Sequence, residues 1–145
     1  MRVHPQGHPH YPPNVNQENH CADAILVVDD ELQLLQLLIR VLERAGYRVF
    51  SATDGEEAIS MFRDWHREIG LTVLDVIIPP NGIDDVLTSM LELRDDLQVI
   101  LTSGDELPDR LRDRLSTCGG VFLRKPFSPK AVVRAVRHAL GESKE

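Results

Sequence analysis

Cysteine and long apolar runs are both scarce in this chain of 145 residues. The two cysteines, Cys21 in a polar segment and Cys118 before a Gly-Gly pair, provide neither a disulfide framework nor a CxxC zinc site. No stretch approaches the roughly 18 apolar residues of a membrane span, and the N-terminus lacks the apolar region of a signal peptide. These absences predict a soluble, cytoplasmic protein in a reducing compartment, without a membrane partner.

Basic residues are also in deficit. Sixteen Lys and Arg stand against 23 Asp and Glu, so the formal net charge is -7. Electrostatic binding to nucleic acid depends on clustered basic residues that displace counterions, and the sequence has no recognisable DNA-binding module. We therefore expect no nucleic-acid partner for these residues.

Residues 1–22 differ in composition from the rest of the chain. They contain four of the nine prolines and four of the six histidines, with almost no aliphatic side chains. Such a segment buries too little apolar surface to offset the entropy of ordering it, so we predict a disordered leader. The alternative interpretation is that the histidines of this segment bind a metal ion. Residues 23–141 then form one domain and residues 142–145 a short tail.

Short apolar runs alternate with amphipathic segments through residues 23–141. The runs predict strands over 24–29, 47–52, 71–78, 98–104 and, together with its exit loop, 121–127, and apolar residues at helical spacing predict helices over 31–46, 55–66, 83–96, 107–118 and 128–141. Five such strand-helix units in series specify an α/β fold, a doubly wound parallel sheet with helices on both faces. We expect the charged helix over 107–118 to present a solvated face.

The predicted helix boundaries carry capping signals. Asp54 with Glu57 three residues later resembles a capping box, and Ser128 followed by Pro129 is typical of a helix start. Gly46 and Gly141 lie where a left-handed residue ends a helix.

Polar residues follow the predicted strands at their carboxyl ends. The first strand is followed by Asp29 and Asp30, the third carries Asp75, and the last is followed by Lys125. The fourth ends in a pair of hydroxyl residues, Thr102 and Ser103. Because parallel strands end at one edge of the sheet, where ligands bind in such folds, we expect these groups to share a shallow cleft.

This set of groups suits magnesium and phosphate chemistry. Three adjacent carboxylates repel one another unless a cation binds among them, and Mg²⁺ prefers a few carboxylate oxygens together with water and phosphate oxygens. Lys125 supplies a compact positive charge for a phosphoryl oxygen. A carboxylate can also accept a phosphoryl group covalently, and Asp75 is the candidate because it stands alone on a central strand.

Four motifs in this order, "ILVVDDE", "LTVLDVIIP", "ILTSG" and "FLRKPF", resemble the response-regulator receiver family of two-component signalling. The resemblance extends over essentially all of residues 23–141. It implies a flavodoxin-like (βα)5 fold with strand order 2-1-3-4-5.

The resemblance also implies roles for individual residues around a bound Mg²⁺. Asp75 matches the phosphoryl acceptor. Asp30 matches a direct metal ligand, Asp29 one that acts largely through water, and the backbone carbonyl of Ile77 a further ligand.

Three more positions match family residues that respond to the phosphoryl group. Ser103, in preference to Thr102, matches the hydroxyl residue that hydrogen-bonds the group after transfer, and Lys125 the lysine that pairs with it. Phe122 falls at the aromatic switch position, although it can equally be plain core.

By resemblance, the donor is a phosphohistidine on a histidine kinase or a phosphotransfer domain. Phosphorylation of Asp75 is then expected to shift the face formed by the helix over 107–118, the strand over 121–127 and the helix over 128–141, changing its protein contacts. The resemblance covers both a stand-alone receiver and the receiver of a hybrid histidine kinase, and a homodimer is possible.

The sequence departs from the family pattern after Asp75. The segment to Gly82 is one residue shorter than usual, and "PPNG" replaces the commoner loop. In the family that the sequence resembles, the residues two after the acceptor and two after the hydroxyl residue tune phosphoryl lifetime, and these match Ile77 and Asp105. Ile77 cannot orient a water molecule whereas Asp105 can, so we expect a long-lived acyl phosphate.

Two other functions fit these residues less well. A small magnesium-dependent phosphatase of the aspartyl-phosphate type needs a second acid two residues after its nucleophile, where this chain has Ile77. A pseudo-receiver that only binds partners is expected to lack Asp75, Asp30 or Lys125, and none is missing.

Overall fold

The computed structural model describes residues 24–80 and 82–142. The predicted leader over residues 1–22 and the end of the predicted tail, residues 143–145, lie outside the described residues, as do residues 23 and 81.

Five parallel strands form one sheet in the order β2-β1-β3-β4-β5. The strands are β1 (Ala24–Val28), β2 (Val49–Ala52), β3 (Ile69–Asp75), β4 (Gln98–Ser103) and β5 (Val121–Arg124). This order confirms the predicted flavodoxin-like fold, in which β1 and β3 lie side by side at the centre of the sheet.

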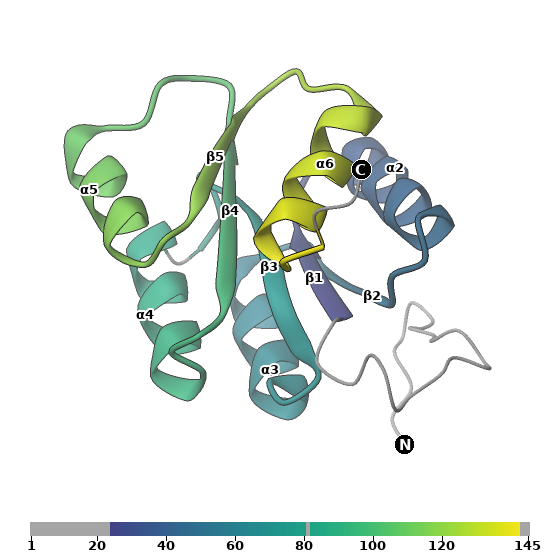
Figure 1. Cartoon of the computed structure of the whole chain (residues 1–145). Coiled ribbons are helices and arrows are strands. Elements are labelled where there is room, and N and C mark those ends of the chain that lie inside the picture. Colours follow the sequence, from purple (N-terminus) through teal and green to yellow (C-terminus); the bar gives the residue numbers. More distant parts are fainter. Residues whose placement is uncertain (1–23, 81, 143–145) are drawn as a thin grey trace.

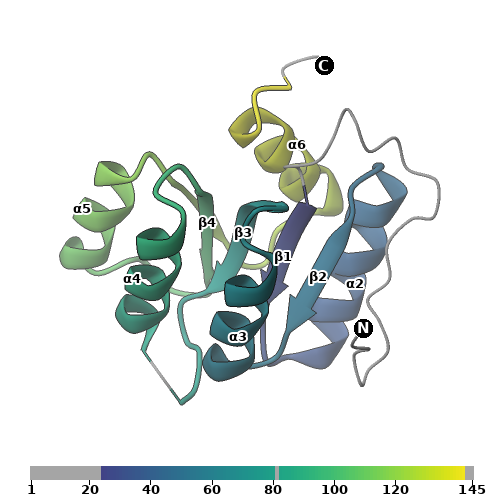
Figure 2. The same cartoon turned by 90° about the horizontal axis from the view of Figure 1, so that it is seen from below.

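Helices cover both faces of the sheet (Figures 1 and 2). α2 (Leu32–Arg44) and α6 (Pro129–Ala139) pack on one face. α3 (Gly55–Trp65), α4 (Ile83–Leu93) and α5 (Asp109–Thr117) pack on the other. Within the described ranges, none of these helices combines the length and the apolar character needed to cross a membrane.

The two central strands are buried along their whole length. Side chains of β1 alternate between the two layers, with Leu26 packed among α3 and α4 residues and Ile25 among α2 and α6 residues. This double coverage explains why the strand sequences read as continuous apolar runs. Asp75 and Ser103 are the last residues of β3 and β4, so these polar groups lie at the carboxyl edge of the sheet.

The predicted helix signals are confirmed. The Asp54 carboxylate accepts a 2.8 Å hydrogen bond from the Glu57 amide, and Ser128 Oγ accepts one of 3.0 Å from the Ala131 amide. Gly46 and Gly141 follow the ends of α2 and α6 with φ of +104° and +81°.

The predicted end of the third strand was wrong. The ladder stops at Asp75, and Ile77, expected inside a buried strand, is 69% exposed. The Val76 amide still donates to the Thr102 carbonyl, but the Ile77 amide turns to the Asp75 Oδ1 atom at 3.0 Å. This side-chain bond replaces the next ladder bond and turns the chain away from the sheet.

The charged helix presents the solvated face that the sequence predicts, because Asp109, Arg112 and Asp113 are exposed, but two of its arginines also pair with α4. Arg110 and Arg114 of α5 both pair with the Asp84 carboxylate in the first turn of α4, Arg114 at 3.0 Å. Arg114 also donates to the Thr88 hydroxyl at 2.7 Å. These contacts connect α5 to α4 in addition to the apolar core to which both helices contribute.

Candidate phosphoryl and metal site

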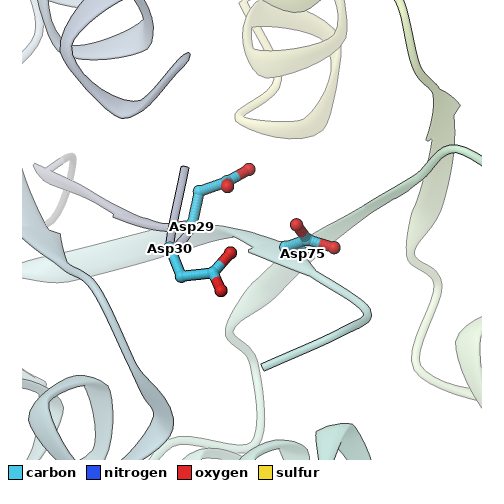
Figure 3. Close-up of side chains that lie close together, drawn as sticks. All are labelled: Asp29, Asp30 and Asp75. Carbon is cyan, nitrogen blue, oxygen red and sulfur yellow. The ribbon is translucent and has the colours of Figure 1, made fainter. Parts of the chain in front are cut away.

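Three aspartates meet where β1 and β3 end (Figure 3). Val28 pairs with Leu74 in the parallel ladder, so Asp29 and Asp75, one position further on each strand, become neighbours. One carboxylate oxygen of each of Asp29, Asp30 and Asp75 lies within 4.8 Å of the others. The sheet register thus produces the acidic cluster that the sequence predicts.

Lys125, directly after β5, reaches into this cluster. Its Nζ atom donates to Asp75 Oδ2 at 2.9 Å and to Asp29 Oδ2 at 3.1 Å. The Lys125 side chain is 21% exposed, whereas those of Asp29 and Asp75 are 2% and 10% exposed. Because water is largely excluded, the ammonium provides the positive charge that these two carboxylates require.

The carboxyl group of Asp29 has a raised pKa. Burial raises the pKa of the Asp29 carboxyl and the nearby charge of Asp75 raises it further, while bonds from the Glu31 amide, at 2.9 Å, and Lys125 partly compensate. For Lys125, burial alone would lower the pKa, but the hydrogen bonds to Asp75 and Asp29 outweigh burial and raise it. The raised pKa of Lys125 therefore keeps its ammonium charged beside the two buried carboxyl groups.

Asp30 differs from its two partners because its side chain is exposed. Counting all four groups in their ionised forms, three carboxylates face one ammonium. Such a surplus of hard oxygen ligands, with one of them open to solvent, fits a divalent cation that keeps part of its water shell. The chemistry of this donor set therefore fits Mg²⁺.

The two candidate hydroxyls lie at the end of β4, and both are buried. Thr102 pairs with Asp75 inside the ladder, and Ser103 is the last strand residue. Ser103 Oγ accepts a 3.0 Å hydrogen bond from the Asp105 amide, while the Ser103 carbonyl accepts one of 2.8 Å from the Lys125 amide. Ser103 is thus connected both to the loop that follows it and to Lys125.

The remaining predicted residues lie around this centre. Phe122 on β5 is half-buried against the core beneath α5, opposite Leu101 in the ladder. Ile77 lies two residues beyond Asp75 with its side chain in solvent.

Two contacts near the site carry no recognisable signal in the sequence. The Gly55 amide, at the start of α3, donates to the Pro79 carbonyl at 2.8 Å and so holds the loop that follows Asp75. Arg124 Nε donates to the Gly104 carbonyl at 3.1 Å. A lone arginine next to the motif lysine reads as a surface residue, so only the fold reveals this bond.

The fold, the acidic cluster and the bridging lysine define a class of signalling domain that accepts a phosphoryl group. The model of the response regulator receiver domain matches residues 25–137, and the chain belongs to this family.

The chain is similar to a transcriptional regulator and to receiver domains of known structure. The transcriptional regulatory protein CpxR of Escherichia coli K12 is 35% identical over 120 residues, which are 82% of this chain and 50% of that protein. The chain spans about half the length of the curated relatives it matches. A response regulator receiver domain protein of Clostridium thermocellum superposes with a TM-score of 0.71 at 27% identity, covering 81% of this chain and 93% of that one. The receiver domain of the hybrid histidine kinase CckA gives 0.70 at 30% identity, covering 81% and 99%.

Proposed function

We propose that this domain takes a phosphoryl group from a phosphohistidine onto Asp75. The donor is a histidine kinase or a phosphotransfer domain, in keeping with the family and with the resemblance to the hybrid kinase receiver. The P–N bond of the phosphohistidine breaks as an Asp75 oxygen bonds to phosphorus, and the electron pair stays on the imidazole. The observation that carries this proposal is the Lys125 ammonium in hydrogen-bond contact with both Asp75 and Asp29.

The protein groups act mainly through position and charge. The Ile77 amide holds Asp75 Oδ1 at 3.0 Å, which orients the carboxylate at the strand end. Lys125 neutralises charge on a phosphoryl oxygen, and the Ser103 hydroxyl donates a hydrogen bond to that group after transfer. Asp75 is 7% exposed, so approach to it is confined to the sheet edge.

Asp30, Asp29 and Asp75, together with the backbone carbonyl of Ile77, are the groups proposed to hold Mg²⁺. When bound, the cation neutralises charge on the phosphoryl oxygens during transfer. Exposure of Asp30 beside two buried carboxylates supports this assignment, because it leaves room for retained water.

The output of the proposed switch is a change in protein contacts on the face formed by α5, β5 and α6. Ser103 begins the segment that leads to α5, and Phe122 packs beneath that helix, so both connect the site to this face. The same proposal includes a homodimer formed through this face and a cytoplasmic location of the protein. The relatives named as transcriptional regulators are about twice as long as the matched region, and DNA binding is not proposed for these residues.

We do not propose phosphatase activity toward external substrates. That chemistry needs an acid two residues after the nucleophile, and the residue there is Ile77, an exposed apolar side chain. The pseudo-receiver alternative is disfavoured because the acids and Lys125 are assembled in contact distance.

Incubation with acetyl phosphate and Mg²⁺, followed by intact-mass measurement, tests the central proposal. The wild type is expected to gain the mass of one phosphoryl group, and Asp75→Asn is expected to gain none. Asp64→Asn, an exposed aspartate on α3, is the matched control and should behave as wild type. An equal gain in Asp75→Asn, or no gain in the wild type, would overturn the assignment.

A further inference from the structure

The loop that follows β4 is fastened to β5 at two consecutive residues. The Lys125 amide donates to the Ser103 carbonyl at 2.8 Å, and the side chain of Arg124 donates from Nε to the Gly104 carbonyl at 3.1 Å. Ser103 and Arg124 are also ladder partners, so the arginine side chain extends the pairing one residue beyond the strands. The loop leaves the same edge of the sheet at which β5 ends (Figure 1).

The Ser103 hydroxyl is tied to this loop. Its Oγ atom accepts a 3.0 Å hydrogen bond from the amide of Asp105, the residue just past Gly104. If the hydroxyl moves toward a group on Asp75, this bond either breaks or draws residues 104 and 105 along. The carbonyl of Gly104 accepts a hydrogen bond from Arg124, so movement of residues 104 and 105 requires this hydrogen bond to break.

We propose that Arg124 is a positioning residue that holds the Ser103 loop in its resting arrangement and thereby opposes engagement of the phosphoryl group. This inference rests on the proposed function of Asp75 and Ser103. Arg124 touches neither the acids nor Lys125 Nζ, and it acts through the Gly104 carbonyl. Its removal frees the segment to follow Ser103, so the phosphorylated arrangement becomes easier to reach.

The contact is suited to regulation more than to stability. The Arg124 side chain and Gly104 are both exposed, so water replaces the bond when it opens. No atom lies within 4 Å of a Cβ built on Gly104, so the loop has space in which to shift. An exposed hydrogen bond of a charged donor changes an equilibrium by about threefold to tenfold.

Two uncharged variants separate the hydrogen bond from the charge. Arg124→Gln keeps an N–H donor at the same number of bonds from the backbone as Nε, whereas Arg124→Met has similar length and no donor. The probe is beryllofluoride in the presence of Mg²⁺, titrated onto wild type and both variants, with Mg²⁺ affinity measured separately. Arg134→Met on α6 serves as the control for loss of an exposed arginine.

Arg124→Met is expected to bind beryllofluoride about threefold to tenfold more tightly than Arg124→Gln. The beryllofluoride affinity of Arg124→Gln should match that of the wild type, and all three proteins should bind Mg²⁺ with the same affinity. Equal affinities of the two variants, or weaker binding by Arg124→Met, would overturn the role of Arg124. A parallel change in Mg²⁺ affinity would likewise reject it, because it would reveal a general disturbance of the acids. Absence of any beryllofluoride binding by the wild type would instead refute the proposed function, and this inference with it.

Discussion

The ammonium of Lys125 lies 2.9 Å from Oδ2 of Asp75. Fifty positions separate the two residues in the chain, and the same ammonium contacts Asp29. The positive charge of the lysine thus lies against two of the three acids and competes electrostatically with any cation bound there.

Replacement of Lys125 by methionine should therefore strengthen Mg²⁺ binding. The change leaves Asp29 and Asp75 without their ammonium, so the dissociation constant for Mg²⁺ is expected to fall by about threefold to tenfold. Calorimetric titration with Mg²⁺ measures this. Lys130→Met, an exposed lysine at the start of α6, should leave the affinity near wild type. Weaker binding by Lys125→Met would show that Lys125 supports the metal site and does not oppose it.

The exposed side chain of Ile77 predicts a persistent acyl phosphate on Asp75. An apolar group two residues beyond the acceptor cannot orient a water molecule for attack. Ile77→Asn provides such a group and is expected to accelerate hydrolysis by about tenfold or more, whereas Ile77→Leu should not. A phosphate-release assay on phosphorylated protein follows the rate. Hydrolysis of the wild type within seconds would contradict the prediction.

Tyr47 should titrate unusually late. Burial and the 2.7 Å hydrogen bond from its hydroxyl to Glu142 raise the pKa of the phenol to about 12. The fold thus favours the neutral phenol, so the contribution of Tyr47 to stability is present below its ordinary pKa of about 10 and is lost as the pH rises toward 12.

Tyrosinate absorbance during a pH titration tests this directly. The chain has two tyrosines, Tyr11 and Tyr47. Tyr47→Phe should remove the late transition and lower the free energy of unfolding by about 0.5 to 1.5 kcal/mol, and Tyr11→Phe should leave the late transition in place. A single transition near the ordinary value in the wild type would refute the assignment.

Asp84 should stabilise the contact between α4 and α5 in a pH-dependent way. Burial alone would raise the pKa of its carboxyl, but hydrogen bonds and charge from Arg110 and Arg114 outweigh burial and lower it below 3.8. The stabilisation is therefore present above the ordinary value and lost as the pH falls through the folded-state pKa.

Asp84→Asn is expected to cost about 0.5 to 1 kcal/mol at neutral pH, since the carboxylate is partly exposed and its pairing is screened by solvent. Urea unfolding at neutral pH, in low and high salt, measures the loss. Asp85→Asn, in the same helical turn and exposed, is the matched control. Equal effects of the two substitutions would argue against the arginine pairing.

Gly120 is required for steric reasons at the start of β5. A Cβ atom at this position would overlap Leu115 Cδ1 and would lie 2.8 Å from the Val99 carbonyl oxygen. Because the backbone oxygen cannot move aside as a side chain can, Gly120→Ala is expected to destabilise the domain by about 1 to 3 kcal/mol in urea unfolding. Gly104→Ala, with no atom nearby, should have a small effect, and a similar loss in both would contradict the steric explanation.

Much of the fold could be predicted because its signals are local. Apolar runs with caps such as Asp54 and Ser128 depend on residues a few positions apart, so the alternation of strands and helices could be predicted from the sequence. The polar strand ends that form the acidic cluster could be predicted in the same way. The exposure of Ile77 could not be predicted, because it depends on whether the Ile77 amide donates to the Asp75 carboxylate or to the neighbouring strand.

The sequence by itself determined the kinds of groups at the sheet edge and the succession along the chain of the strands that carry them. Only the tertiary structure decided which groups touch. Lys125 meets Asp29 across 96 positions and Arg114 meets Asp84 across 30, because strand register and helix packing set those distances. The bond from Arg124 to Gly104 has the same origin. Local patterns constrain chemistry along the chain, whereas contacts between distant residues follow from the geometry of the whole sheet.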